Sequence, residues 1–251
     1  MAKTRLDIAL VERGLAETRA AAQRLIMAGL VFSGDRRLDK AGHAMAADVP
    51  IEVRGQPHPY VSRGGLKLAR GLDHFAIPVA DRVALDVGAS TGGFTDCLLQ
   101  RGVAKVYAVD VGTNQLAWKL RTDPRVVSME KTNIRDVTRA DVPEPIDLIV
   151  CDASFISLRT ALPAALALAA SGAHLVALIK PQFEVGRGRV GKGGIVREPG
   201  LHAEVCATIE AWLAAQHGWR VLGLTDSPIE GADGNREFLI AGVLEGERGD
   251  S

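Results

Sequence analysis

Short apolar runs alternate with amphipathic stretches along the chain from about residue 60 to residue 245. Each apolar run is short and rich in β-branched residues, which is typical of a buried strand, whereas most stretches between them have helical spacing. Strands are expected at residues 83–87, 103–109, 126–129, 146–152, 175–180, 219–224 and 237–243. Helices are expected after Ser62, a candidate N-cap, and at residues 94–100, 115–120, 158–170 and 201–215.

The order of these elements predicts an α/β domain with a seven-stranded, Rossmann-like sheet. Alternating strands and helices indicate parallel strands, because a parallel pair needs a crossover connection. The last two strands are the exception. Too few residues separate them for a helical crossover, so we expect them to pair antiparallel.

The first 55 residues have a different pattern of apolar and polar positions, which predicts a small α+β domain. Its expected elements are helices at residues 6–11 and 19–28 and strands at residues 30–32 and 51–53. Gly14 and Gly29 follow the two helices as stop signals, and Thr18 is a candidate cap of the second helix. Residues 56–61 contain prolines that exclude helix, so we expect a linker there. The sheet domain is then expected at residues 62–245, followed by a tail at residues 246–251.

Composition places the chain among soluble globular proteins, with 251 residues, 47% of them hydrophobic and 24% charged. Thirty basic and thirty acidic residues cancel, so the net charge neither indicates nor excludes a nucleic-acid partner. Charges near the N-terminus argue against a signal peptide. The uncharged residues 160–179 include Pro163 and a Ser-Gly pair, which favours helix, turn and strand over a membrane span.

Three cysteines, Cys97, Cys151 and Cys206, are far apart in the sequence and are not accompanied by histidine clusters. This pattern predicts buried, reduced thiols in a cytoplasmic protein rather than disulfides or a structural zinc site. We therefore expect no bound metal.

A glycine-rich turn follows the strand at residues 83–87, with the sequence Asp86-Val87-Gly88-Ala89-Ser90-Thr91-Gly92-Gly93-Phe94-Thr95. Glycines allow a sharp turn and close approach of the backbone to a ligand, and Thr91 or Thr95 can cap the next helix. A strand, a glycine turn and a helix N-terminus make a nucleotide-type site. The spacing is not Gly-x-Gly-x-x-Gly and resembles the first motif of S-adenosylmethionine (SAM)-dependent methyltransferases. The alternative is an ordinary strand-to-helix turn. The cofactor-binding candidates here are Asp86, Gly88, Ser90, Thr91, Gly92, Gly93 and Phe94.

Asp110 ends the next apolar strand, about twenty residues beyond the glycine turn. A carboxylate at this position can accept hydrogen bonds from both ribose hydroxyls of an adenosine. The alternative is a solvated carboxylate at the end of a strand. The agreement of Asp110 with the turn before it favours a nucleoside-containing cofactor.

Three further charged residues, Asp152, Lys180 and Glu237, lie at strand ends. The carboxyl ends of parallel strands meet at the ligand crevice of such sheets, so Asp152 and Lys180 are expected to be neighbours. An antiparallel last strand enters from the same edge and adds Glu237. A structural ion pair between Lys180 and Asp152 is the alternative. Lys67 by itself would be a surface lysine of a helix.

Basic residues gather in two parts of the chain. One is the N-terminal domain. The other is the stretch at residues 186–197, which has five glycines and four basic residues but no acid. Its position after the fifth strand favours a phosphate-binding lid, while the alternative is a flexible surface loop. The RNA-binding candidates are Arg5, Arg19, Arg24, Arg36, Arg37, Arg63, Arg187, Arg189 and Lys192.

Lys67, Asp152, Lys180 and Glu237 together match the Lys-Asp-Lys-Glu tetrad of the FtsJ-type ribose 2′-O-methyltransferases. The motifs Val61-Ser62-Arg63-Gly64-Gly65-Leu66-Lys67, Ser154-Phe155-Ile156-Ser157-Leu158 and Lys180-Pro181-Gln182-Phe183-Glu184 add to the match. The whole chain resembles the TlyA family of such enzymes, in which an S4-like RNA-binding domain precedes the methyltransferase domain.

The resemblance implies a SAM cofactor, with the adenine near Asn133 and Ile134, and Asp152 in both the cofactor site and the catalytic site. It implies methylation of a cytidine ribose in large-subunit ribosomal RNA (rRNA) and, for some members, also in small-subunit rRNA. Some members were named hemolysins, but no stretch here has the pattern of a pore.

The expected chemistry is deprotonation and alignment of a ribose hydroxyl, with Lys180 as a candidate general base. Two other functions stay open. One is a non-catalytic RNA-binding or ribosome-assembly factor. The other is base methylation, which calls for an Asn-Pro-Pro-aromatic motif or a nucleophilic cysteine, and Cys151 does not resemble one.

Overall fold

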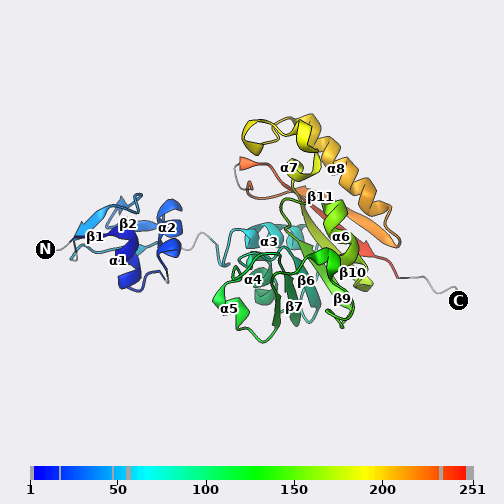
Figure 1. Cartoon of the computed structure of the whole chain (residues 1–251), viewed down its shortest axis with the longest axis horizontal. Helices are drawn as coiled ribbons and strands as arrows, with labels where there is room; N and C mark the ends of the chain where they lie inside the picture. Colours follow the sequence, from blue (N-terminus) through cyan, green and yellow to red (C-terminus); the bar gives the residue numbers. More distant parts are fainter. Residues whose placement is uncertain (1–2, 17, 47, 55–57, 232–233, 247–251) are drawn as a thin grey trace. The chain divides into compact units, whose positions relative to one another are not determined.

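The computed structural model describes residues 3–16, 18–46, 48–54, 58–231 and 234–246. The chain divides into two compact units, Met1–Pro59 and Tyr60–Ser251 (Figure 1). Residues 56–57 of the expected linker and residues 247–251 of the expected tail lie outside the described residues.

Two helices and two small antiparallel sheets form the N-terminal unit. Its elements are β1 (Lys3–Arg5), α1 (Leu6–Glu12), α2 (Arg19–Met27), β2 (Val31–Ser33), β3 (Arg36–Arg37), β4 (Ala44–Ala46) and β5 (Glu52–Val53). β1 pairs with β4, and β2 lies between β3 and β5. The hydroxyl of Thr18 accepts a hydrogen bond from the backbone N–H of Ala21 and so caps α2, as the sequence predicts. The sequence did not indicate β1, β3 and β4, because two or three residues are too few for a visible alternation.

A seven-stranded sheet forms the centre of the C-terminal unit (Figure 1). Its strands are β6 (Val83–Val87), β7 (Lys105–Val109), β8 (Val126–Met129), β9 (Ile146–Cys151), β10 (Ala169–Ile179), β11 (Trp219–Asp226) and β12 (Phe238–Leu244). They lie in the order β11-β12-β10-β9-β6-β7-β8. β12 runs antiparallel to both of its neighbours, and the other pairs are parallel. The predicted fold class is confirmed.

Helices pack on both faces of this sheet. They are α3 (Gly64–His74), α4 (Gly93–Gln100), α5 (Trp118–Arg121), α6 (Leu158–Leu166), α7 (Pro181–Glu184) and α8 (Pro199–Ala214), with 3-10 turns at Ile134–Asp136, Arg187–Arg189 and Lys192–Gly194. Alternate residues of the central strand β9 face opposite cores. Leu148 and Val150 pack with α3, α4 and α5, whereas Ile149 packs with α6 and α8.

Both predicted helix caps of the sheet domain are wrong. Neither Thr91 nor Thr95 caps α4, because its N-cap is Gly92 in the left-handed conformation, with φ +95°. Thr95 lies inside the helix and donates its hydroxyl hydrogen to Asp86. Ser62 does not cap α3 either, because Arg63 occupies the N-cap position without a side-chain hydrogen bond.

Some element lengths also differ from the expectation. The single turn of α5 replaces the longer helix expected at residues 115–120. α6 ends at Leu166, and β10 begins early, at Ala169, with a register shift before His174. The Ser-Gly pair at residues 171–172 therefore lies in an irregular strand, whose pairing with β9 no local pattern reveals. Cys206 is only partly buried, unlike Cys97 and Cys151.

Candidate active site

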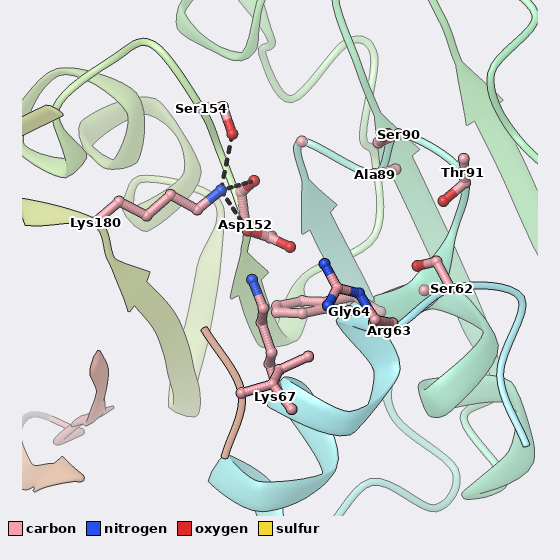
Figure 2. A pocket seen from close by; sticks show the side chains of 14 residues that line it. Ser62, Arg63, Gly64, Lys67, Ala89, Ser90, Thr91, Asp152, Ser154 and Lys180 are labelled. Atoms are coloured by element: carbon pink, nitrogen blue, oxygen red, sulfur yellow. Dashed lines mark hydrogen bonds and ion pairs between the residues drawn. The ribbon is translucent and has the colours of Figure 1, made fainter. Parts of the chain in front are cut away.

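A pocket of about 270 Å³ lies at the carboxyl edge of the sheet, where β6 and β9 end beside each other (Figure 2). The register pairs Val87 with Cys151, so Gly88 and Asp152 leave adjacent strands at the same level. The start of α3 and the glycine turn before α4 supply most of the remaining lining. The lining residues are Ser62, Arg63, Gly64, Lys67, Gly88, Ala89, Ser90, Thr91, Gly93, Phe94, Asp152, Ser154, Lys180 and Ile229.

The glycine turn fits tightly against its neighbours. A Cβ atom on Gly88, which has φ +81°, would lie 3.0 Å from the backbone of Ala153. A Cβ atom on Gly93 would lie 2.2 Å from the Ser62 hydroxyl oxygen. Both positions therefore need glycine, because a side chain would push apart the segments that line the pocket.

Asp110 holds the same turn from β7. One carboxylate oxygen accepts a hydrogen bond from the Ser90 backbone N–H at 2.8 Å, and the other accepts one from the Gly112 N–H at 2.7 Å. Each carboxylate oxygen can accept a second hydrogen bond, so Asp110 retains capacity for ribose hydroxyls. Asp110 itself is not among the residues that line the 270 Å³ pocket.

Asp86 is fully buried beneath the turn. Its Oδ2 accepts a hydrogen bond from the Thr95 hydroxyl at 2.7 Å, while its Oδ1 has no partner among the described residues. Burial raises the pKa of the Asp86 carboxyl to about 7, although the Thr95 hydrogen bond opposes the shift. A buried carboxyl with an unpartnered oxygen is suited to a cationic ligand group.

Two ion pairs stand at the mouth of the pocket. Lys67 Nζ lies 2.5 Å from Glu237 Oε2, and Lys180 Nζ lies 2.6 Å from Asp152 Oδ1. Both lysines are 8% exposed and Glu237 is 3% exposed. The four residues predicted to be catalytic are thus brought together, and the structure pairs each lysine with one acid. The surface position that the local pattern alone favoured for Lys67 is wrong, because its ammonium group is buried against Glu237.

Lys180 has two further oxygen neighbours beyond the carboxylate of Asp152 (Figure 2). Its ammonium group donates to the Ser154 hydroxyl at 2.8 Å and to the Asp152 carbonyl at 3.2 Å. These two hydrogen bonds and the ion pair with Asp152 together hold Nζ in one place. Ser154 follows Asp152 at the strand end, but nothing in the local sequence showed that its hydroxyl would meet Lys180.

A second pocket, of about 370 Å³, adjoins the first. The two pockets share Lys67, Asp152, Ser154 and Lys180. The second pocket is also lined by Phe155, Gln182, Phe183, Val190, Gly194, Asn235 and Glu237. The ion-paired side chains therefore lie where two cavities meet, which is the geometry needed to bring two ligands together.

Several residues predicted to bind cofactor lie outside the lining of the first pocket. They are Asp86, Gly92, Asp110, Asn133 and Ile134. Asn133 caps a 3-10 turn through a hydrogen bond from the Arg135 N–H, and Ile134 is buried in the core. Their assignment to the adenine site stays a prediction.

The basic candidates of the sheet unit lie in different settings. Arg63 lines the first pocket. Arg189 forms two short hydrogen bonds with Glu204 of α8, at 2.5 and 2.6 Å, on the surface. The side chains of Arg187 and Lys192 lie outside what the structure describes.

The basic candidates of the N-terminal unit divide into two groups. Arg5 and Arg19 both pair with the buried Asp7, each at 3.0 Å. The hydrogen bond from Arg5, together with those from Gln23 and Arg19, holds the pKa of the Asp7 carboxyl well below its usual range. Arg24, Arg36 and Arg37 are exposed, and none of them forms an ion pair within the described part of the chain.

No group of three or more His, Cys, Asp or Glu side chains in the described residues could hold a metal ion. None of the helices in the same residues is long and apolar enough to cross a membrane.

Comparison with known proteins accounts for both units. Residues 60–243 match the FtsJ-like methyltransferase family, and residues 4–44 match the S4 domain. The 16S/23S rRNA (cytidine-2′-O)-methyltransferase TlyA of Mycobacterium tuberculosis is 46% identical over 95% of this chain and 89% of its own. A solved structure of a candidate hemolysin from Streptococcus thermophilus is 46% identical, covers 98% of this chain and 90% of its own, and has a TM-score of 0.76. A Listeria monocytogenes structure assigned as a SAM-dependent methyltransferase shares the fold, with 15% identity, 74% of this chain and 100% of its own covered, and a TM-score of 0.52.

The fold is the Rossmann-like sheet found in SAM-dependent methyltransferases, and the family match identifies the chain as a methyltransferase. Within that class, the chain belongs to the FtsJ-like methyltransferase family and to its TlyA group, in which an S4 domain precedes the catalytic domain. The family resemblance drawn from the sequence is confirmed.

Proposed function

We propose that the protein transfers the methyl group of SAM to the 2′-hydroxyl of a ribose in rRNA, on a cytidine. One observation carries the proposal. Two cavities meet at Lys67, Asp152, Ser154 and Lys180, and one of them is built on the glycine turn typical of a nucleoside cofactor. The cytidine and rRNA specificity follows the name of the Mycobacterium tuberculosis relative.

The residues of the first pocket fit SAM. Gly88 and Gly93 leave no room for side chains of their own, so the segments that line the pocket stay close together. Asp86 and Asp110 lie next to the pocket rather than in its lining. The unpartnered Oδ1 of Asp86 would suit the ammonium group of the methionine part, and the free acceptor capacity of Asp110 would suit the ribose hydroxyls. SAM supplies an activated methyl group when bound, and no metal is needed for the transfer.

The acceptor nucleotide would occupy the second pocket. Its 2′-hydroxyl would then lie beside Lys180, on the side of the ion pairs opposite the cofactor. Alignment supplies most of the rate, and a general base adds about 10²–10⁴-fold. Lys180 would first release one of its own protons to solvent and then take the hydroxyl proton, while Asp152 and Ser154 hold its Nζ in place. Glu237 orients Lys67.

The chemistry of Cys151 argues against base methylation through a cysteine nucleophile. Burial raises the pKa of the Cys151 thiol to about 12, so almost none of it is thiolate at neutral pH. The side chain is also 0% exposed. A ribose oxygen beside Lys180 is the better-supported acceptor.

The N-terminal unit would deliver the RNA. Its exposed Arg24, Arg36 and Arg37 are free to contact phosphates, which fix position without reading sequence. The S4 match over residues 4–44 supports this role.

Mass-spectrometric mapping of rRNA methylation tests the proposal. We expect a ribose-methylated cytidine in rRNA from cells with the gene, its loss on deletion, and its return with the wild-type gene but not with Asp152→Ala. SAM binding by the purified protein, measured by calorimetry, should accompany it. An unchanged ribose-methylation map on deletion would overturn the proposal, and SAM binding without any RNA product would point to another acceptor.

A further inference from the structure

Asn235 lines the second pocket, and both polar groups of its side-chain amide are hydrogen-bonded. It is 2% exposed and lies two residues before Glu237. Its Oδ1 accepts a hydrogen bond from the Val196 backbone N–H at 3.1 Å, and its Nδ2 donates to the Gly194 carbonyl at 3.0 Å. Only one orientation of the amide satisfies both partners, because one needs an acceptor and the other a donor.

Val196 is also held from α8. The imidazole Nε2 of His202 lies 2.8 Å from the Val196 carbonyl oxygen, so this nitrogen carries the proton and donates. His202 is buried and stacks edge-on against Phe238. Both backbone groups of Val196 are thus bonded by buried side chains, one from the nearby start of α8 and one from the segment before β12.

These contacts anchor the end of the glycine-rich loop at residues 186–197. Gly194 and Asn235 both line the second pocket beside Glu237. In the earlier part of the loop, Arg189 forms an exposed ion pair with Glu204, and such surface pairs contribute little. The loop is therefore fixed at its second end, where it forms a wall of the pocket.

Glu237 depends on the same segment. The Gly231 N–H donates to the Asn235 carbonyl at 2.9 Å, and a Cβ atom on Gly231 would lie 2.1 Å from Glu237 Oε1. The stretch that carries Asn235 and Glu237 therefore has two roles. Asn235 holds the pocket wall, and Glu237 is the ion-pair partner of Lys67. A shift of this stretch would move the wall and the ion pair together.

We infer that Asn235 is a positioning residue for the acceptor nucleotide. It fixes residues 194–196 as a wall of the second pocket, in register with Glu237, and it does not touch the cofactor pocket. This inference rests on the proposed function. A purely structural amide would support the fold without affecting how a bound nucleotide is aligned.

Asn235→Ala tests the inference, with Gln216→Ala as a matched control. Gln216 also bonds a backbone carbonyl, that of Trp212, but at the far end of α8. We expect Asn235→Ala to lower kcat/KM for the rRNA substrate about tenfold or more, while the Kd for SAM changes less than twofold. Gln216→Ala should leave kcat, KM and Kd unchanged. Hydrogen exchange at Val196 and its neighbours should speed up in Asn235→Ala alone.

Asn235→Asp keeps the acceptor for the Val196 N–H and loses the donor to Gly194, so it should show an intermediate loss even if the alanine variant does not fold. Normal kcat and KM per folded enzyme in a soluble Asn235 variant would overturn the inference. The wild type separates the two proposals. If the wild type methylates no ribose, the proposed function fails. If the wild type is active and the Asn235 variants are equally active, only the inference about Asn235 fails.

Discussion

At the scale of single residues, the pairing of charges decides what each group can do. Lys180 donates two hydrogen bonds and pairs with the Asp152 carboxylate, whereas Lys67 pairs with Glu237, so the two lysines differ although both are buried equally. A lysine that acts as a base must accept a proton, whereas a lysine that only positions its neighbours can stay charged. Substitution of Lys180 distinguishes these roles.

Lys180→Arg should be about as inactive as Lys180→Ala if Lys180 must accept the hydroxyl proton. Arginine can donate hydrogen bonds to Asp152, but its guanidinium stays protonated at any working pH. The measurement is the single-turnover rate of methylation, with SAM and RNA binding measured as controls and expected to persist. Substantial activity in the arginine variant would make Lys180 an electrostatic positioner and leave solvent to take the proton.

Asp86→Asn should stabilise the protein at pH 8 and change its stability little near pH 4. Burial raises the folded-state pKa of Asp86 to about 7, above the value of about 4 for an exposed aspartate. Between these values the folded state binds more protons, so wild-type stability falls as pH rises from about 4 to about 7 and then levels off. We expect a gain on the order of 2–4 kcal/mol at pH 8 from urea unfolding.

Asp35→Asn is the control for this prediction, because Asp35 is exposed and its substitution should have no such pH dependence. An Asp86→Asn variant whose stability relative to wild type is the same at pH 5 and pH 8 would show that Asp86 is ionised in the folded state throughout.

At the scale of elements, the turn between β6 and α4 is held by β7. Asp110, just beyond the end of β7, accepts a hydrogen bond from the backbone of Ser90 and so sets the shape of the turn. Ser90 and Gly88 both have positive φ, +49° and +81°. A non-glycine residue in this conformation is strained and persists only when its neighbours stabilise it. The hydrogen bond from Ser90 to Asp110 stabilises Ser90 in this way.

Asp110→Ala should weaken SAM binding by about 1.5–3 kcal/mol for each charged hydrogen bond lost. Calorimetry of SAM binding measures the change. Asp123→Ala is a suitable control, since Asp123 pairs with Arg125 in a neighbouring loop that does not line the pocket. Unchanged affinity in a folded Asp110→Ala protein would show that the ribose lies elsewhere.

At the scale of the whole molecule, the proposed function divides RNA binding and methyl transfer between the two units. The formal charges of the chain cancel, so RNA binding must depend on local clusters of basic side chains. Arg19 is a weaker candidate than the sequence suggested, because it compensates the buried Asp7. Reversing its charge would also leave an acid buried without one of its partners.

Arg24→Glu combined with Arg36→Glu should therefore reduce RNA affinity without disturbing SAM binding. Each lost phosphate contact lowers the slope of log K against log salt by about 0.7–0.9, so the pair should lower it by up to about 2. Arg220→Glu is the control, since Arg220 pairs with Glu245 at an edge of the sheet domain. Wild-type methylation and salt dependence in the double variant would exclude this surface from RNA binding.

The sequence by itself determined the seven strands of the large sheet, their alternation with helices, the glycine turn and the charged residues at the strand ends. These features are local, because burial imposes short apolar runs and a turn with positive φ imposes glycine. Asp152 and Lys180 could be placed together for the same reason, since each follows a parallel strand. The pairing of Lys67 with Glu237 joins residues 170 positions apart, and only the position of α3 against the start of β12 brings them into contact.

Tertiary structure alone decided the partners that lie across elements. The Ser154 hydroxyl meets Lys180 because β9 and β10 are adjacent, and Asn235 meets Val196 because β12 enters the sheet beside the end of the glycine-rich loop. Arg19 in the N-terminal unit is likewise paired with a buried acid that its own helix does not contain. The pattern of hydrophobic positions does not reveal such contacts, because hydrogen bonds between distant segments depend on packing in three dimensions.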